Sequence, residues 1–483
     1  RIELVVGICL SAMAAGQEEM RGPCHRLQAG FAPSMHIRRK FTSLPHREEN
    51  VCGLRSVGMK VKGEGEVKRR GMEQMDQVEL WMIEKKVRAA DLEHAFIPRK
   101  HGDVRGIVAK KEMQLDETMV RLPRDAVLCV KGNEPCPDDK LLEFWNRYDK
   151  WYVRLGLKLL MEQRKGSKSA IWGYIRLLPE VDQVQNFPCE WDEELLDELK
   201  CESIIASVKK QKKVWAEMVQ EFPKLCPGSD FSAQELRWSW HMCLSRAFAG
   251  QFGGGMLSMI PVVGLVIELL ASLNPSKDDF ALLPIIDSCN HDGRINKTDL
   301  VFNPLSNELI LRNGQGTLKA GEEVRITYGT LDNDELLQRF GFVEDNCLHD
   351  KVKIGINDIA EAMQVEGGGE ALQERLLEAG LGSACLDELV IGRRGAVDRP
   401  AEVQLALGIL FGEAGKGVSS FERVSSEVLG RVCQHVLLGK YAVGDLQVGA
   451  GGDGASEVQV NLVKEYREAR ASVLREAILV HNK

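Results

Sequence analysis

Two apolar stretches that end in polar side chains organise the middle of the chain. The first is Leu283–His291 (LPIIDSCNH), and the second is Gly321–Gly329 (GEEVRITYG). Short apolar runs bounded by turn residues are typical of buried strands. If the two strands are neighbours, Asn290, His291 and Tyr328 meet at their ends. The pattern therefore predicts a small-molecule site built from two strand ends.

A third β-rich region precedes these two stretches. The runs Arg105–Ala109 and Met119–Pro123 are joined by a polar stretch around Gln114–Glu117. Two such runs with a polar turn between them predict a hairpin-like pair. Gly102 and Gly106 allow a ligand to approach the backbone closely, or they serve only as turn residues.

Apolar residues at helical spacing predict two mainly helical regions. The first is Asp138–Ser232, and a further helix over Ser232–Phe248 begins with a capping box formed by Ser232 and Glu235. The second region begins at Lys351 and lacks His or Cys clusters, so we expect an accessory domain there. Its predicted helices are Glu370–Ala379, Ala401–Phe411, Phe421–Val436 and Ser456–Val480.

Residues 1–75 are expected to form an N-terminal tail, either a targeting segment or a disordered stretch. Ile2–Ala15 resembles the apolar region of a signal peptide, and Arg21–Arg47 contains no acidic residue, as in organelle transit peptides. Ala29–Pro33 resembles the phenylalanine-centred motif at the signal–transit junction of plastid proteins in algae with secondary plastids. We therefore expect a plastid location, with the cytoplasm or nucleus as alternatives.

One apolar run is long enough to raise the question of a membrane span. It is Met256–Leu273, and it is interrupted by Pro261, Gly264 and Glu268. A spanning helix needs about 20 predominantly apolar residues, and an acidic residue within it is costly. We therefore predict a buried or partner-facing insertion and no stable membrane span.

Composition and motifs exclude several functional classes. The chain has 483 residues and a net charge of −8, which argues against nucleic acid as the main partner. Its 13 cysteines include no Cys-x-x-Cys pair, so no metal site is expected. No P-loop, no Gly-x-Ser-x-Gly elbow and no Rossmann glycine fingerprint occurs. The predicted site must therefore belong to another architecture.

Taken in order, the motifs resemble those of SET-domain protein methyltransferases of the Rubisco large-subunit lysine methyltransferase-like group. The blocks that carry this resemblance are Gly102–Ala109, Ser169–Pro179 (SAIWGYIRLLP), Ser245–Phe248, Leu283–His291, Gly321–Gly329 and Phe340–Glu344. Together they cover about Asp76–Asn346.

The resemblance implies an α+β fold with a pseudoknotted, β-rich SET domain at 76–346. It also implies a helical insert at about 138–245, an extra insertion at about 249–280, and a mainly helical, substrate-binding-like C-terminal domain at 351–483. We further expect a monomer.

The family's functional residues can be carried over by position. The resemblance implies S-adenosylmethionine as cofactor, held by Asp103, Val104, Arg105, Arg246, Asn290 and His291, the last two largely through main-chain groups. The acceptor side would be formed by Arg246, Asp287, Tyr328 and Phe340, with Tyr328 as the catalytic residue. Two positions depart from the family pattern, because Phe340 stands where a tyrosine is common and Asp292 where a serine is frequent.

The chemistry implied by the resemblance agrees with these residue types. In-line methyl transfer needs a neutral, aligned acceptor nitrogen, so positioning and desolvation supply much of the acceleration. The main expectation is a protein-lysine N-methyltransferase acting on a non-histone protein. The alternatives are a protein-histidine N-methyltransferase and a catalytically silent SET-like binding module.

Overall fold

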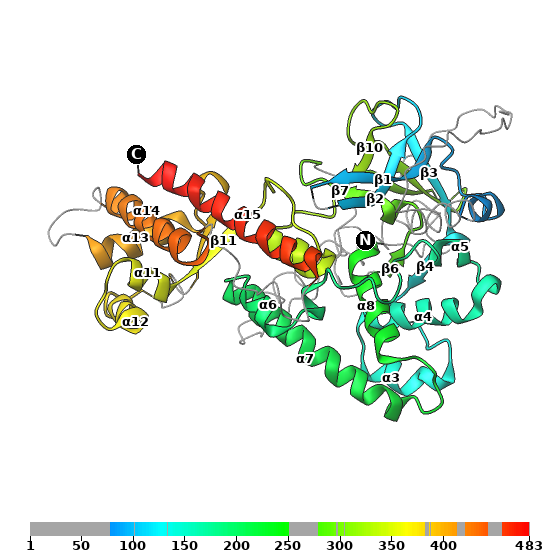
Figure 1. Ribbon diagram of the computed structural model, residues 1–483, viewed down its shortest axis with the longest axis horizontal. Helices are drawn as coiled ribbons and strands as arrows, with labels where there is room; N and C mark the ends of the chain where they lie inside the picture. Colours follow the sequence, from blue (N-terminus) through cyan, green and yellow to red (C-terminus); the bar gives the residue numbers. More distant parts are fainter. Residues whose placement is uncertain are drawn as a thin grey trace, which may run out of the picture. The chain divides into compact units, whose positions relative to one another are not determined.

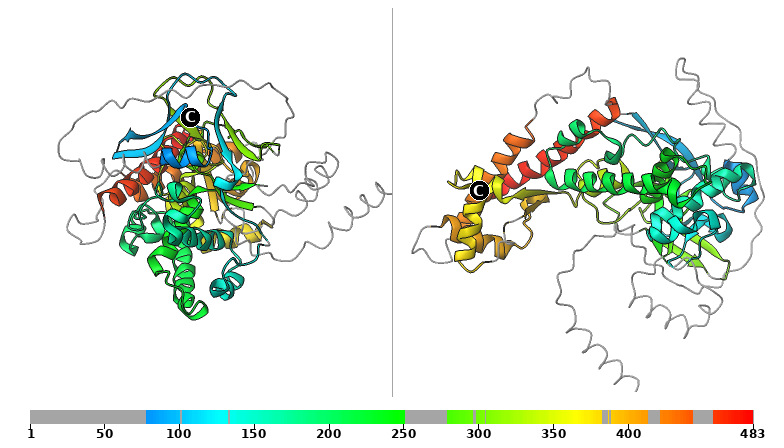
Figure 2. Two further views of the ribbon diagram at one scale, coloured as in Figure 1. Left: turned by 90° about the vertical axis from the view of Figure 1, so that its right-hand side faces the viewer. Right: turned by 90° about the horizontal axis from the view of Figure 1, so that it is seen from below.

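The computed structural model describes residues 78–100, 102–132, 134–250, 279–295, 298–303, 305–381, 386, 388–412, 421–442 and 456–482. The predicted tail at 1–75 and almost all of the predicted insertion at 249–280 lie outside these residues. Figures 1 and 2 show the arrangement of the helices and strands.

Strands and helices alternate irregularly along the chain. The strands are β1 (Leu92–Arg99), β2 (Gly102–Ala109), β3 (Thr118–Pro123), β4 (Leu128–Val130), β5 (Ala247–Gly250), β6 (Asp279–Leu282), β7 (Asn290–His291), β8 (Leu300–Asn303), β9 (Glu308–Arg312), β10 (Glu323–Ile326), β11 (Lys351–Gly355) and β12 (Glu388–Gly392). The helices are α3 (Leu142–Arg147), α4 (Trp151–Lys165), α5 (Trp172–Ile175), α6 (Glu193–Asp197), α7 (Glu202–Leu225), α8 (Ala233–Arg246), α10 (Asn333–Phe340), α11 (Ile356–Ala362), α12 (Gly368–Glu378), α13 (Pro400–Phe411), α14 (Phe421–Lys440) and α15 (Glu457–His481). The expected α+β class is confirmed.

Small sheets of short strands surround the predicted site. Among the described residues before position 346 their strand orders are β1-β2-β10-β7, β3-β9-β8 and β4-β6-β5. β7 and β10 run parallel, with Asn290 opposite Arg325 and His291 opposite Ile326. The prediction that the two polar-tipped stretches are neighbours is therefore confirmed.

The predicted hairpin between Arg105–Ala109 and Met119–Pro123 is wrong. β2 pairs with β1 along its whole length, whereas β3 pairs with β9 in a different sheet. β1 gives little sequence signal because most of its residues are only partly buried or exposed. An apolar pattern shows which face of a strand is buried but does not identify its partner, so pairing a run with its nearest neighbour along the chain gives the wrong sheet.

The helical insert packs on these sheets and shares their core. Trp145, Leu157 and Trp240, from α3, α4 and α8, are fully buried in the same hydrophobic cluster as residues of β2, β3 and β10. The predicted capping box at the start of α8 is confirmed, since the Glu235 amide donates to Ser232 Oγ at 3.2 Å. This packing fixes the end of α8, from which Arg246 projects.

After position 350 the described residues pack around a second hydrophobic cluster. It is built from β11, β12, α11–α14 and the C-terminal half of α15. The β11–β12 pair was not predicted, whereas α15 and its cap at Ser456 were. The central turns of α15 reach back to α10, where Tyr466 and Arg470 both bind Asp334. The chain end thereby becomes part of the surroundings of the site.

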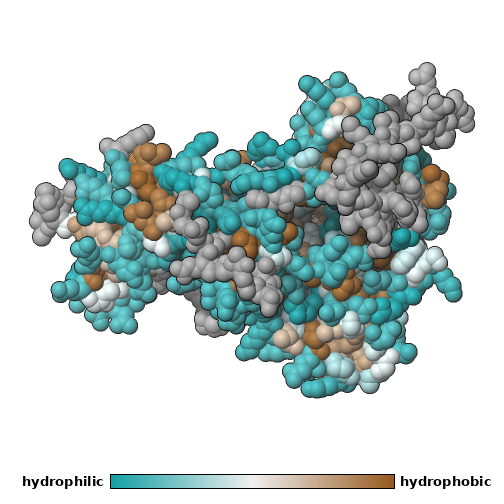
Figure 3. All heavy atoms as spheres, viewed as in Figure 1, coloured by the Kyte–Doolittle hydropathy of each residue, from teal (hydrophilic) through white to brown (hydrophobic). Residues whose placement is uncertain are grey.

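The face shown in Figure 3 is mainly hydrophilic, with hydrophobic residues in small, separate groups. In the described part of the chain, no helix is long and apolar enough to cross a membrane. The run Met256–Leu273 lies outside the residues to which that finding applies.

Candidate active site

A cavity of about 720 Å³ lies between the strand ends, the helical insert and α15. Its volume is typical of a small-molecule site. Of the residues proposed from the sequence, those that line it are Val104, Arg105, Arg246, Asp287, Asn290, His291, Tyr328 and Phe340. Asp103 is exposed and does not line it. Residues that are up to 236 positions apart in sequence, Val104 and Phe340, are thus brought to one cavity.

Tyr328 is held rigidly at the cavity wall. Its hydroxyl donates to the Cys289 carbonyl oxygen at 2.9 Å, and its ring packs against Phe340 with centroids 4.8 Å apart. Burial raises the pKa of Tyr328 well above its usual value. The hydroxyl therefore keeps its proton at neutral pH and can orient a ligand, but it is not a general base.

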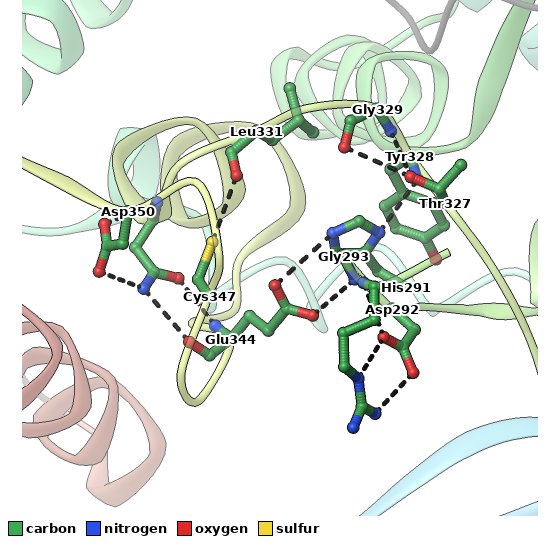
Figure 4. A network of polar contacts seen from close by, with 12 residues as sticks. His291, Asp292, Gly293, Thr327, Tyr328, Gly329, Leu331, Glu344, Cys347 and Asp350 are labelled. Atoms are coloured by element: carbon green, nitrogen blue, oxygen red, sulfur yellow. Dashed lines mark hydrogen bonds and ion pairs between the residues drawn. The ribbon is translucent and has the colours of Figure 1, made fainter. Parts of the chain in front are cut away.

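The side chain of His291 holds the backbone of Tyr328. Its Nδ1 accepts a hydrogen bond from the Tyr328 amide at 3.0 Å, and the two rings stack with centroids 5.0 Å apart (Figure 4). Burial lowers the pKa of His291, so the ring is neutral at neutral pH. Because Nδ1 is an acceptor, the ring proton of the neutral form is on Nε2.

Asn290 is fixed by a buried carboxylate that sequence reasoning did not single out. Its Nδ2 donates to Glu323 Oε1 at 2.8 Å and to the Arg105 carbonyl oxygen at 3.2 Å. Glu323 also binds Arg99 at 2.7 Å and Arg325 at 2.9 Å. The side chains of Asn290 and His291 are thus both engaged within the protein, and their backbone pairs with β10.

The stretch Leu283–His291 is not the continuous strand that its apolar character predicts. After β6 the chain turns at Ile285, which has φ +70°, and forms a 3-10 turn over Ile286–Ser288 before the two residues of β7. A positive φ is costly for a β-branched residue and is retained only where its surroundings enforce it. The turn directs the Asp287 side chain inward and carries the Cys289 carbonyl to Tyr328.

Asp287 is the centre of a buried polar cluster beside the cavity. Its Oδ2 accepts a hydrogen bond from the Tyr174 hydroxyl at 2.6 Å and lies 3.4 Å from Arg246 Nη1. Arg246 also donates to the Asp287 carbonyl oxygen at 3.2 Å. Burial raises the pKa of Asp287, and the Arg246 guanidinium opposes that shift. The cluster joins α5, α8 and the 3-10 turn into one wall.

Two further basic groups lie next to this wall. Arg105 donates from Nη1 to the Leu177 carbonyl oxygen at 2.5 Å, and burial followed by Arg246 lowers the pKa of Arg105 to about 10. Burial, Arg105 and Arg246 lower the pKa of His94 to about 4. At neutral pH the two arginines are therefore charged and His94 is neutral.

Several residues that line the cavity or hold its lining residues were outside the sequence-based prediction. Tyr174 lies in the block Ser169–Pro179, and Glu323 lies in Gly321–Gly329. Their position in these blocks is the sequence signal that could have identified them, and both side chains are buried. The N-terminal turns of α15 supply Val458, Asn461 and Leu462 to the cavity. Nothing in the local pattern of α15 could have shown this, because its partners are more than 100 positions away.

Gly106 is a place of close approach, but the approaching group belongs to the protein. A Cβ at this position would lie 2.7 Å from Asn290 Nδ2 and 3.3 Å from Glu323 Oε1. The glycine therefore makes room for the Asn290–Glu323 contact. Among the described residues, no group of three or more His, Cys, Asp or Glu side chains could hold a metal ion.

Comparison with known proteins identifies the architecture. No protein-family model matches the chain. In sequence it is 26% identical over 282 residues to the actin-histidine N-methyltransferase of Xenopus tropicalis, covering 54% of this chain and 43% of that protein. The human protein of the same name is 25% identical over 282 residues, covering 54% and 42%. The chain thus spans less than half the length of these relatives.

Solved structures match over a larger part of the chain. The SET domain of LSMT bound to lysine and AdoHcy superposes with a TM-score of 0.53 at 16% identity, covering 85% of this chain and 91% of that one. Rubisco LSMT bound to AdoMet superposes with a TM-score of 0.52 at 16% identity and the same coverage. The SET fold expected from the sequence motifs is thereby confirmed.

Proposed function

We propose that this chain is an S-adenosylmethionine-dependent protein N-methyltransferase that acts on a side-chain nitrogen. The observation that carries the proposal is the single cavity into which Arg246, Asn290, His291 and Tyr328 converge. Each of these residues was proposed from its motif, and the motifs are separated by long stretches of sequence. A fold alone hosts many functions, so this local constellation is the stronger support.

The residues present fit the proposed cofactor. The cavity wall carries two half-buried, charged guanidinium groups, on Arg105 and Arg246, of the type that binds a carboxylate. The aromatic rings of Phe340 and Phe342 also line the cavity and offer apolar surface. The AdoMet named in the Rubisco LSMT structure is consistent with this combination.

S-adenosylmethionine, when bound, supplies a methyl group on a sulfonium centre. The chain's own contribution is to hold a neutral nitrogen in line with it. The Tyr328 hydroxyl donates its hydrogen bond to the Cys289 carbonyl oxygen. The lone pairs of the hydroxyl oxygen are therefore free to accept a hydrogen bond from an N–H of the incoming side chain. Phe340 and Phe342 exclude water there, which favours the uncharged form of an amine.

Lysine is the acceptor that we propose first. The LSMT structures with lysine and monomethyllysine support it, as does the apolar wall that favours a neutral amine. Histidine is the second candidate, because the sequence relatives are actin-histidine N-methyltransferases. Phe340 and Tyr328, tilted by 31° at 4.8 Å, provide flat surfaces that also suit an imidazole ring.

The test is a methylation assay with site mapping. The purified chain is titrated with S-adenosylmethionine by calorimetry, then incubated with labelled donor and proteins of compartment lysates. We expect donor binding and label on a protein, which mass spectrometry then locates on lysine. Label on histidine would select the second candidate. Donor binding without transfer to any protein would favour a silent SET-like module, and absence of donor binding would refute the proposal.

The plastid location suggested by residues 1–75 stays a prediction, as do a monomeric state and the lack of a nucleic-acid partner. The location can be tested by expressing the chain with its own N-terminus free and a fluorescent protein fused to its C-terminus.

A further inference from the structure

Two buried polar atoms face each other beside Tyr328, on two residues that also line the cavity. His291 Nε2 and Glu344 Oε2 are 3.9 Å apart, and neither has a hydrogen-bond partner among the described residues. The His291 side chain is 1% exposed and that of Glu344 is 19% exposed. Buried polar atoms are rarely left unpaired, so this pair calls for a functional explanation.

The tautomer of His291 determines what the pair can do. Nδ1 accepts from the Tyr328 amide, so Nε2 carries the ring proton and directs it toward Glu344. A separation of 3.9 Å is too long for a hydrogen bond, and a bridging water would need about 5.5 Å between the two atoms. A displacement of about 1 Å therefore completes a direct, charge-assisted bond.

Glu344 is supported on its other side by the protein. Its Oε1 accepts from the Gly293 amide at 2.8 Å, and a Cβ on Gly293 would lie 2.8 Å from Glu344 Oε2. The Glu344 backbone is clamped by Asn333, which accepts from its amide at 2.8 Å and donates to its carbonyl at 3.2 Å. Asn333 is in turn bound to Asp350 at 2.8 Å. The carboxylate is therefore held in place toward the imidazole.

We infer that Glu344 is a positioning residue for Tyr328 and acts through His291. The carboxylate holds the imidazole in the tautomer whose Nδ1 accepts from the Tyr328 amide. That contact fixes the strand end, so the Tyr328 hydroxyl stays on the Cys289 carbonyl and toward the acceptor nitrogen. The inference rests on the proposed methyl transfer, in which Tyr328 is the catalytic residue.

The test combines two substitutions. Glu344→Gln removes the charge and keeps the shape. His291→Asn keeps an acceptor near the Nδ1 position but removes the group that faces Glu344. We expect each variant to lower kcat about tenfold, the effect of losing one hydrogen bond to a charged group, with KM for donor and protein within about twofold. The double variant should be no slower than the slower single variant.

A matched control is available on the surface. Glu361 lies 3.4 Å from His435 Nε2, and both side chains are exposed. Glu361→Gln breaks the same pair of residue types away from the cavity, so it should leave kcat unchanged. Melting temperatures of all variants report any general loss of stability.

Three results would overturn the inference. If Glu344→Gln raises KM for the protein and spares kcat, the carboxylate contacts the substrate directly. If Glu344→Gln is equally harmful with and without His291→Asn, it does not act through the imidazole. The third readout needs no activity: hydrogen exchange of the Tyr328 amide should be faster in Glu344→Gln, and unchanged protection refutes the positioning role even if methyl transfer itself is not found.

Discussion

Replacing Tyr328 by phenylalanine isolates the hydroxyl from the ring. The ring contacts with Phe340 at 4.8 Å and His291 at 5.0 Å are retained, and the lost group is one hydrogen bond to the Cys289 carbonyl oxygen. A neutral hydrogen bond of this kind contributes about 1 kcal/mol to stability. For a domain of this size that corresponds to a fall in melting temperature of about 2–4 °C.

The expected effect on turnover is much larger than the effect on stability. A donor or acceptor that is aimed at the reacting groups contributes about 10²–10³ in rate. Folded domains are stable by about 5–15 kcal/mol, so a loss of about 1 kcal/mol leaves nearly all molecules folded. A rate loss of that size in Tyr328→Phe can therefore only come from the hydroxyl at the reaction centre. Binding of S-adenosylmethionine should change little, since the ring stays in place.

The assay compares single-turnover methylation rates, donor affinity by calorimetry, and thermal melts. Tyr441→Phe is a matched control, because Tyr441 is a buried tyrosine whose hydroxyl donates to the Lys200 carbonyl oxygen at 3.3 Å, outside the cavity. Both variants should lose similar stability, but only Tyr328→Phe should lose turnover. A Tyr328→Phe rate within about threefold of wild type, where the hydroxyl is expected to contribute about 10²–10³, would refute the catalytic role of the hydroxyl.

Two further substitutions test the surroundings of the cavity. Gly106→Ala places a Cβ 2.7 Å from Asn290 Nδ2 and should weaken S-adenosylmethionine binding by about tenfold through displacement of Asn290, measured by calorimetry; unchanged affinity would show that Asn290 does not shape the donor site. Asp292 has its pKa lowered to about 2 by hydrogen bonds from Arg294, so it stabilises the fold above about pH 4 and loses that effect as pH falls toward 2. Because the Arg294 side chain is 72% exposed, Asp292→Asn should cost only about 1 kcal/mol at pH 7 by urea unfolding, less at high salt, and a loss that is independent of pH would contradict this assignment.

Much of the candidate site could be predicted from short sequence blocks. Leu283–His291 and Gly321–Gly329 each combine an apolar run with polar residues at its end. The apolar run is expected in the core, so the polar residues are expected at the edge of the core. Helix boundaries at Ser232 and Ser456 were predictable because capping is a local interaction between residues three positions apart.

Strand partners and the interior hydrogen bonds were not predictable in the same way. The local pattern of Arg105–Ala109 predicts the wrong partner, because its neighbour β1 has a weak apolar pattern. The apolar pattern of Leu283–His291 predicts one strand, whereas the chain turns at Ile285. Such features depend on what packs against a segment, and a single sequence does not contain that information in local form.

The sequence by itself determined which residues are available for chemistry: Tyr328 and the Asn290–His291 pair stand at ends of apolar runs. The tertiary structure alone decided how they are used. It turned the side chain of His291 toward the Tyr328 amide and that of Asn290 toward Glu323, and placed Glu344 behind the imidazole. The physical reason is that motif identity depends on neighbours along the chain, whereas orientation depends on hydrogen bonds between segments distant in sequence.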